Sequence, residues 1–168
     1  TTKAPKIEYY PPEPKRPSNE DLPYCYEVME LKGRKIKING LEANGKADIT
    51  YETLVAKLDP EIEDGCYTPK DCIPDQHLNI IVPYRDREQH LHYFLLFMHR
   101  MLKNQKRSYC IIIAEQADFG QFNRAKLLNV GYLEAKKHRH WTEKVKKIPD
   151  CYGFHDVDMI PDDDNNLY

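Results

Sequence analysis

The sequence has no long apolar segment. Its longest apolar runs, 79–82 and 110–114, are far shorter than the roughly 20 residues that a membrane-spanning helix needs. It shows no signal-peptide pattern, and it begins with Thr1 rather than Met. We therefore expect no spanning segment within these residues, and we expect a processed product or a piece of a longer protein.

Two common nucleotide-binding motifs are also absent. The chain contains neither the Gly-x-Gly-x-x-Gly of dinucleotide-binding folds nor the Gly-Lys-Ser/Thr of P-loops. Its net formal charge is −2, so no overall attraction to nucleic acid or to a membrane surface is expected. At 168 residues, 40% of them hydrophobic, the chain is long enough for one domain with a real core, or most of one.

The five cysteines include no Cys-x-x-Cys pair, which argues against a zinc site. Cys110 lies in an apolar, strand-like run, and we interpret it as a buried thiol. The other four flank polar or turn segments, where disulfides form in an oxidising compartment. Because five is odd, one cysteine must stay free or pair outside the chain. These four are Cys25, Cys66, Cys72 and Cys151.

The chain changes character twice. Residues 1–23 hold six of the 12 prolines, which favours an extended, solvated backbone and indicates a linker or stem. Residues 24–75 are mixed in composition. Within them, the patterns predict a strand and turn over 34–40, a short helix over 50–58 and a loop over 65–72.

Residues 76–168 have a regular pattern. Short apolar runs predict strands at 78–82, 109–114 and 152–155. Apolar residues at helical spacing predict a helix from about 86 to 105, and Asn123 suits the N-cap of a second helix, 124 to about 137. An order of strand, helix, strand, helix, strand predicts a mostly parallel α/β sheet with right-handed crossovers.

Two groups of residues in this region have a simple structural interpretation. The apolar stripe of the first helix is core, and the histidines around it are structural rather than ligands. The stripe is Leu91, Phe94, Leu95, Met98, Met101 and Leu102, and the histidines are His90, His92 and His99.

A basic segment over 136–147 has two interpretations. It could form a phosphate or polyanion patch, but runs of charge are usually solvated, so an exposed surface loop is the preferred interpretation.

A polar cluster follows each predicted strand. In open parallel sheets, ligands bind outside the carboxyl ends of the strands, so these clusters are expected at one rim. Arginines, an amide, a helix N-terminus and two carboxylates suit a metal-bound nucleotide diphosphate. The clusters are Arg85, Asp86 and Arg87, then Asn123 and Arg124, then Asp156 and Asp158.

Asp156 and Asp158 form an Asp-x-Asp pair at the end of the third predicted strand. An extended backbone would place both carboxylates on one side, where they could hold a hard divalent cation and bridge it to a diphosphate. A second acidic run, 162–164, is interpreted as a solvated turn.

Three blocks of the sequence resemble the beta-1,4-galactosyltransferase family. They read IIVPYRDR at 80–87, FNRAKLLNVG at 122–131 and FHDVDMIP at 154–161. Weaker similarity extends the resemblance over nearly all of 22–168. It implies the nucleotide-diphospho-sugar transferase (GT-A, Rossmann-like) fold, of which this chain would be the N-terminal part. It also implies inverting, Mn²⁺-dependent transfer of Gal or GalNAc from a UDP-sugar, UDP-galactose or UDP-GalNAc, to a terminal sugar of a glycan acceptor.

The resemblance also implies roles for individual residues. Asp158 would be the manganese ligand, and Asp156 would lie near the donor sugar. The loop from Pro83 to Arg87 would hold the uridine and neighbouring groups. No catalytic residue is expected within the chain, because the base, the acceptor region and a second metal ligand would lie beyond Tyr168. The implied nucleotide-sugar site is Pro83, Tyr84, Arg85, Asp86, Arg87, Phe122, Asn123, Arg124, Asp156, Val157 and Asp158.

Three further expectations rest on the resemblance. Cys25 would pair with Cys72, and Cys151 with a cysteine after the last residue. Residues 1–23 would be the stem of a Golgi type II membrane protein whose anchor is absent, which places the protein in the Golgi lumen. The segment 136–150 is longer than usual for the family and would be a surface insertion.

Two alternatives to a donor-binding half of a transferase stay open. One is a truncated, non-catalytic domain that binds at most UDP and Mn²⁺. The other is a purely structural α/β interaction domain.

Overall fold

A computed structural model describes residues 22–31, 49–137, 150–163 and 165–168. Most of the stem, the strand and turn expected over 34–40, and most of the basic segment lie outside the described residues. Among the described residues, none of the helices is long and apolar enough to span a bilayer.

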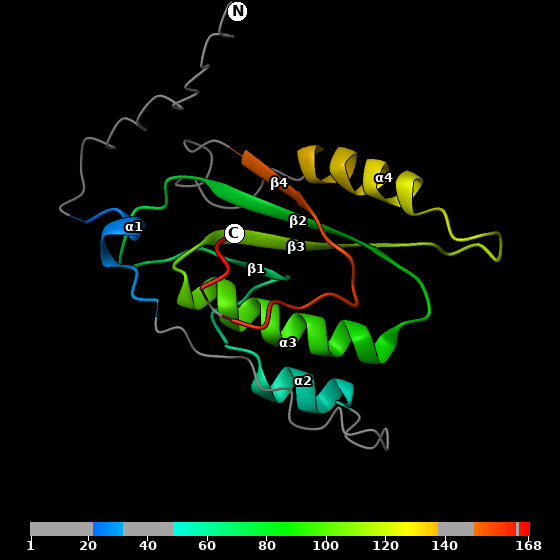
Figure 1. The fold of residues 1–168 in the computed structure, drawn as a ribbon, viewed down its shortest axis with the longest axis horizontal. Coiled ribbons are helices and arrows are strands. Elements are labelled where there is room, and N and C mark those ends of the chain that lie inside the picture. The colour runs from blue at the N-terminus through cyan, green and yellow to red at the C-terminus, as the bar shows by residue number, and fades with distance from the viewer. Residues whose placement is uncertain (1–21, 32–48, 138–149, 164) are drawn as a thin grey trace, which may run out of the picture.

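A four-stranded mixed sheet forms the centre of the molecule, in the order β1-β3-β2-β4 (Figure 1). β2 pairs in parallel with β3 and with β4, whereas β1 joins β3 antiparallel. The predicted parallel α/β arrangement is therefore confirmed for three strands. The strands are β1 (Cys66–Tyr67), β2 (His77–Tyr84), β3 (Ser108–Glu115) and β4 (Asp150–Phe154).

Two long helices cover opposite faces of the sheet (Figure 1). The first, α3 (Glu88–Asn104), has a second short helix, α2 (Tyr51–Lys57), on its outer side, and α4 (Arg124–Lys137) packs on the other face against β2 and β3. A short helix, α1 (Cys25–Val28), precedes them. The sheet is thus the middle of three layers, as expected where crossover helices bury both faces.

The helix predictions are confirmed, because each has a clear local signal. The predicted 50–58 helix is α2, where the Thr50 hydroxyl accepts a hydrogen bond from the Thr53 N–H. Asn123 caps α4, since its side-chain oxygen accepts from the Lys126 N–H at 3.0 Å. The apolar stripe of α3 packs into the main core cluster, with Phe94 and Met98 fully buried.

α4 approaches β2 closely at Gly131. A Cβ atom placed there would lie 2.5 Å from Ile81 Cγ2, nearer than two carbon atoms can pack. Glycine at this position therefore lets the helix that begins at Asn123 lie directly against the central strand.

Two sequence predictions are wrong. Residues 65–72 were expected to be a loop, but they contain β1, whose two residues are too few to show a pattern in sequence. Cys110 was interpreted as a buried thiol, but it forms a disulfide with Cys66. The antiparallel register places Cys66 directly opposite Cys110, so the strand pairing brings the two sulfurs together.

The implied Cys25–Cys72 disulfide is present, with an S–S distance of 2.08 Å. The Cys25 N–H also donates to the Ile73 carbonyl at 2.9 Å. Cys151 is exposed and has no disulfide partner within the described part of the chain, so its expected pairing beyond Tyr168 stays a prediction.

Two buried histidines predict a pH dependence of stability. Burial lowers the pKa of His77 and of His99 from 6.5 to about 4. Between these values the unfolded chain binds protons that the folded chain does not, so stability falls as the pH drops from about 6.5 to about 4. Each histidine is expected to contribute a loss on the order of 2–3 kcal/mol.

Urea unfolding at several pH values measures this dependence. His99→Gln is expected to flatten the slope between pH 6.5 and 4. His90→Gln, which changes an exposed histidine on the same helix, should leave the slope as in the unchanged protein. Equal slopes for all three proteins would contradict the assignment to His99.

Candidate functional site

A cavity of about 370 Å³ lies at the carboxyl ends of the parallel strands. Segments that follow β2, β3 and β4 all contribute to its wall, as expected for neighbouring parallel strands. Five of the seven residues expected at the rim therefore line one cavity. The lining residues are Pro83, Arg85, Arg87, Phe122, Arg124, Asp156, Val157 and Asp158.

The Asp-x-Asp pair reaches this cavity from a turn rather than from a strand. β4 ends at Phe154, one residue before the predicted end, and the Met159 N–H donates to the Asp156 carbonyl at 3.2 Å across the turn. Val157 between the two aspartates is buried in the core cluster, whereas Asp158 is exposed. Burial of Val157 thus anchors the turn, and both carboxylates line the same cavity.

Asp156 is paired with Arg124 across the cavity. The Arg124 Nε lies 2.6 Å from Asp156 Oδ1, and a terminal guanidinium nitrogen lies 3.1 Å from Oδ2, which is a bidentate pair. The carboxylate raises the pKa of Arg124 further. This pair joins the start of α4 to the turn after β4, and it occupies both oxygens of Asp156.

Of the two aspartates that line the cavity, Asp158 is the one without an arginine partner among the described residues. It makes no ion pair in the described structure. No cluster of three or more His, Cys, Asp or Glu side chains that could hold a metal occurs within the described residues. One hard oxygen ligand fits a cation that takes its other ligands from a diphosphate and water, and does not fit a cage made by the protein alone.

Arg85, one of the lining residues, contacts the loop before α4 in two ways. Its guanidinium donates to the Gly120 carbonyl at 2.6 Å and lies over the Phe122 ring, 5.4 Å from the ring centre. Phe122 is nearly half exposed, so its ring presents an aromatic surface beside two arginines. An aromatic surface next to cations suits a base and a phosphate group held together.

Three of the residues implied by the resemblance do not line the cavity. Tyr84 is half-buried against the core, and Asp86 adopts a positive φ of 50° in the loop before α3. Asn123 uses its side-chain oxygen to cap α4. Their roles in a nucleotide-sugar site stay predictions, and their observed contacts are structural.

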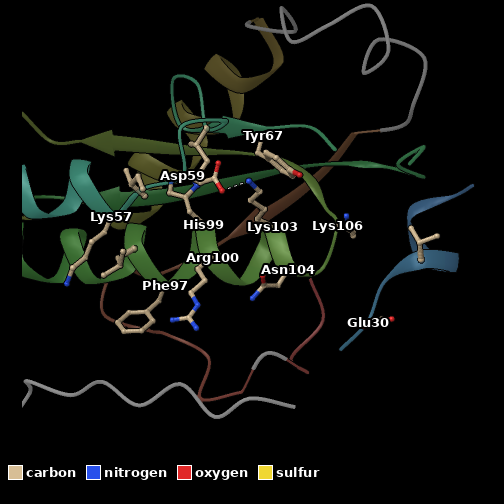
Figure 2. Close-up of a pocket in the computed structure, with 14 residues that line it drawn as sticks. Glu30, Lys57, Asp59, Tyr67, Phe97, His99, Arg100, Lys103, Asn104 and Lys106 are labelled. Carbon is tan, nitrogen blue, oxygen red and sulfur yellow. Dashed lines mark hydrogen bonds and ion pairs between the residues drawn. The ribbon is translucent and has the colours of Figure 1, made fainter. Parts of the chain in front are cut away.

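A second, larger cavity of about 920 Å³ lies between α1, α2 and the outer side of α3 (Figure 2). Its central cation, Lys103, contacts Asp59 and lies 2.7 Å from Glu61. The charge of this lysine is therefore neutralised by protein groups. None of the predicted site residues lines this cavity, so it is separate from the rim.

The sequence analysis missed Gln116, which stands at the end of β3 and organises the loop before α4. Its amide nitrogen and oxygen both bond within that loop, to Gln121 and Asn123. Nothing in the polar 115–121 segment distinguishes this residue from its neighbours, because its partners become apparent only once the loop is folded.

Comparison with known proteins shows which family the chain belongs to. Residues 27–168 match a family described as the N-terminal region of glycosyl transferase group 7. The chain belongs to this family. The sequence resemblance stated above is thereby confirmed, and the mixed sheet between helices confirms the α/β fold class.

Relatives within the family are beta-1,4-galactosyltransferases. Human beta-1,4-galactosyltransferase 4 is 46% identical over 73% of this chain, and human beta-1,4-galactosyltransferase 3 is 38% identical over 90%. Mouse beta-1,4-galactosyltransferase 1 is 44% identical over 68%. The chain spans only about a third of these relatives, 33%, 35% and 27% of their respective lengths.

Solved structures of the family include a Drosophila beta-1,4-galactosyltransferase 7 variant in complex with manganese, UDP-Gal and xylobiose. It is 34% identical, with a TM-score of 0.45, over 55% of this chain and 35% of that one. A second structure of that enzyme, in complex with xylobiose, matches with 34% identity and a TM-score of 0.43 over the same shares of the two chains.

Proposed function

We propose that this chain is the donor-binding part of a beta-1,4-galactosyltransferase-like enzyme of the Golgi lumen, and that its rim cavity binds a UDP-sugar with Mn²⁺. The observation that carries the proposal is the cavity at the strand ends, where Asp158 is unpaired beside Arg85 and Arg87. A cavity lined by an oxygen ligand and two arginines suits a metal-bound diphosphate.

The residues that line the cavity would bind different parts of the metal–nucleotide complex. Asp158 supplies one oxygen ligand, and manganese bound there would stabilise the leaving diphosphate. Arg87 lies at the N-terminus of α3, where backbone N–H groups and a cation favour an anion. Phe122 offers its ring to the uracil, and Arg85 holds that ring in place.

Arg124 and Asp156 form the wall on the donor-sugar side. Because each neutralises the other, the wall carries little net charge and presents polar edges to sugar hydroxyls. The acceptor site and the general base are not assigned to any residue of this chain. We propose Gal or GalNAc as the transferred sugar and a terminal glycan sugar as the acceptor, by analogy with the family.

The disulfide Cys25–Cys72 supports a luminal location, since such bonds persist in oxidising compartments. Residues 1–23 would be the stem, 24–75 the N-terminal region of the catalytic domain and 76–168 the nucleotide-sugar-binding half.

Calorimetric titration with UDP tests the proposal. The protein is expected to bind UDP with Mn²⁺ and to bind it much more weakly in the presence of a chelator. Asp158→Asn is expected to weaken Mn²⁺-dependent binding at least tenfold, about 1.4 kcal/mol, because it removes the one charged ligand.

Asp162→Asn is the matched control, since it removes the same charge from an exposed aspartate outside the cavity. It should bind UDP like the unchanged protein, and far-UV spectra should agree among all three. Equal affinity for the unchanged protein and Asp158→Asn would rule out the metal role of Asp158.

A further inference from the structure

The Gln116 side chain makes several hydrogen bonds within the loop between β3 and α4. Its Oε1 accepts a hydrogen bond from the Asn123 N–H at 2.8 Å, and its Nε2 donates to the Gln121 carbonyl at 3.1 Å. The same Nε2 lies 2.9 Å from Asp118 Oδ1. The backbone N–H of Gln116 donates to the Tyr84 carbonyl at 3.0 Å, which ties the residue to the end of β2.

These contacts continue to the nucleotide side of the cavity. Asp118 Oδ1 also accepts from the Gly120 N–H at 2.8 Å, and the Gly120 carbonyl accepts from Arg85 at 2.6 Å. Arg85 in turn lies over Phe122, the residue before Asn123. The contacts form a closed ring that starts and ends at Gln116 and includes two side chains lining the cavity, Arg85 and Phe122.

We propose that Gln116 is a positioning residue for the donor site, which sets the places of Phe122 and Arg85 before the nucleotide binds. The inference rests on the proposed function for what binds there, but the geometry of the ring stands by itself. Gln116 is not in the cavity wall, so any effect on nucleotide affinity must pass through the loop.

Only an amide meets the demands of this position. The Asn123 N–H needs an acceptor, whereas the Gln121 carbonyl and the Asp118 carboxylate need a donor. Glutamate has nearly the same shape and keeps the acceptor, but it loses the donor and places a second carboxylate beside Asp118. In Gln116→Glu, repulsion between the new carboxylate and Asp118 should therefore weaken the ring of contacts, with little change of packing.

The test is Mn²⁺-dependent UDP affinity of Gln116→Glu at pH 7. We expect a loss of about tenfold with an unchanged midpoint of thermal unfolding. Gln121→Glu is the matched control, because it adds the same charge to the same loop, whereas only the backbone carbonyl of Gln121 takes part in the ring. The control should bind UDP within twofold of the unchanged protein.

Two further measurements separate positioning from a merely structural role. Asp118→Asn, added to Gln116→Glu, removes the opposed charge and should restore part of the lost affinity. As the pH falls below about 5, the affinity of Gln116→Glu relative to the unchanged protein should also recover, because one of the two carboxylates becomes protonated. Equal affinities of Gln116→Glu and Gln121→Glu would overturn the proposal.

Amide hydrogen exchange tests, without a ligand, whether Gln116 positions the loop between β3 and α4. In Gln116→Glu, the Gly120 and Asn123 amides are expected to exchange faster, while amides in β2 remain protected as before. Unchanged exchange at both loop amides would overturn the positioning role. If the unchanged protein binds no UDP, the proposed function fails, whereas exchange still reports whether Gln116 sets the loop.

Discussion

Replacing Phe94 with alanine is expected to lower the free energy of unfolding by about 3–5 kcal/mol. Phe94 lies on α3 and is 0% exposed, in the core cluster with Val82 and Met98. Val82 belongs to β2, which is hydrogen-bonded to β3 and β4, and Met98 belongs to α3. These elements are held in place by other contacts, so they cannot collapse fully into the space that the ring leaves. The cost therefore includes both lost burial and a residual cavity.

Removing the Phe94 ring should also disturb the proposed donor site. The Phe94 ring lies 5.0 Å from the His155 ring, and His155 directly precedes Asp156. The His155 Nδ1 is 2.9 Å from the Asp156 carbonyl, so a shift of the histidine moves the turn that carries both aspartates. We expect weaker Mn²⁺-dependent UDP binding in Phe94→Ala.

Phe97→Ala is the matched control on the same helix. Phe97 is only partly buried and stacks on Tyr93, with ring centres 6.4 Å apart, at the edge of the larger cavity (Figure 2). Urea unfolding followed by circular dichroism should show a loss for Phe97→Ala of less than about 1.5 kcal/mol. Equal losses for the two variants would contradict the burial argument.

Removing the Cys66–Cys110 disulfide, by replacing both cysteines with alanine, is expected to lower the free energy of unfolding by about 2–4 kcal/mol. The bond closes a loop with a sequence separation of 44, so its loss gives the unfolded chain a large gain in freedom. In the folded protein, β1 has only two residues and pairs with β3 alone. Without the bond, this edge strand is expected to separate first.

Cys151→Ala is the control for this experiment, because Cys151 is exposed and forms no disulfide in the described structure. It should change the free energy of unfolding by less than about 0.5 kcal/mol. The measurement is urea unfolding without reductant. A double variant as stable as the unchanged protein would contradict the expected stabilisation, which comes from restricting the unfolded chain.

Much of the fold could be predicted from sequence, because its signals are local. The apolar spacing on α3 predicts which face of the helix is buried. Asn123, a good N-cap residue, directly precedes the first residue of α4. The apolar runs of β2 and β3 locate the central strands, although both extend slightly further than predicted. These elements are specified by residues that are neighbours along the chain.

Apart from Gln116, whose partners lie within its own loop, the missed features depend on partners that are distant in sequence. β1 exists through its pairing with β3, and the Cys66–Cys110 bond follows from that register. Arg124 and Asp156 are 32 positions apart, so their pairing needs the folded sheet. Most residues expected at the rim line the cavity, but Asp86 and Asn123 do not, and the sequence does not indicate that Arg124 pairs with Asp156 rather than with Asp158.

The parallel register has a consequence for the order of assembly. β2 meets β3 through His77 and Ser108, which are 31 positions apart, whereas it meets β4 through His77 and Asp150, which are 73 apart. Closing the longer loop costs about 0.8 kcal/mol more in chain entropy. We therefore expect β4 to dock last during folding. The arginine side of the rim would form early, and Asp158, the proposed cation ligand, would join it only in the final step.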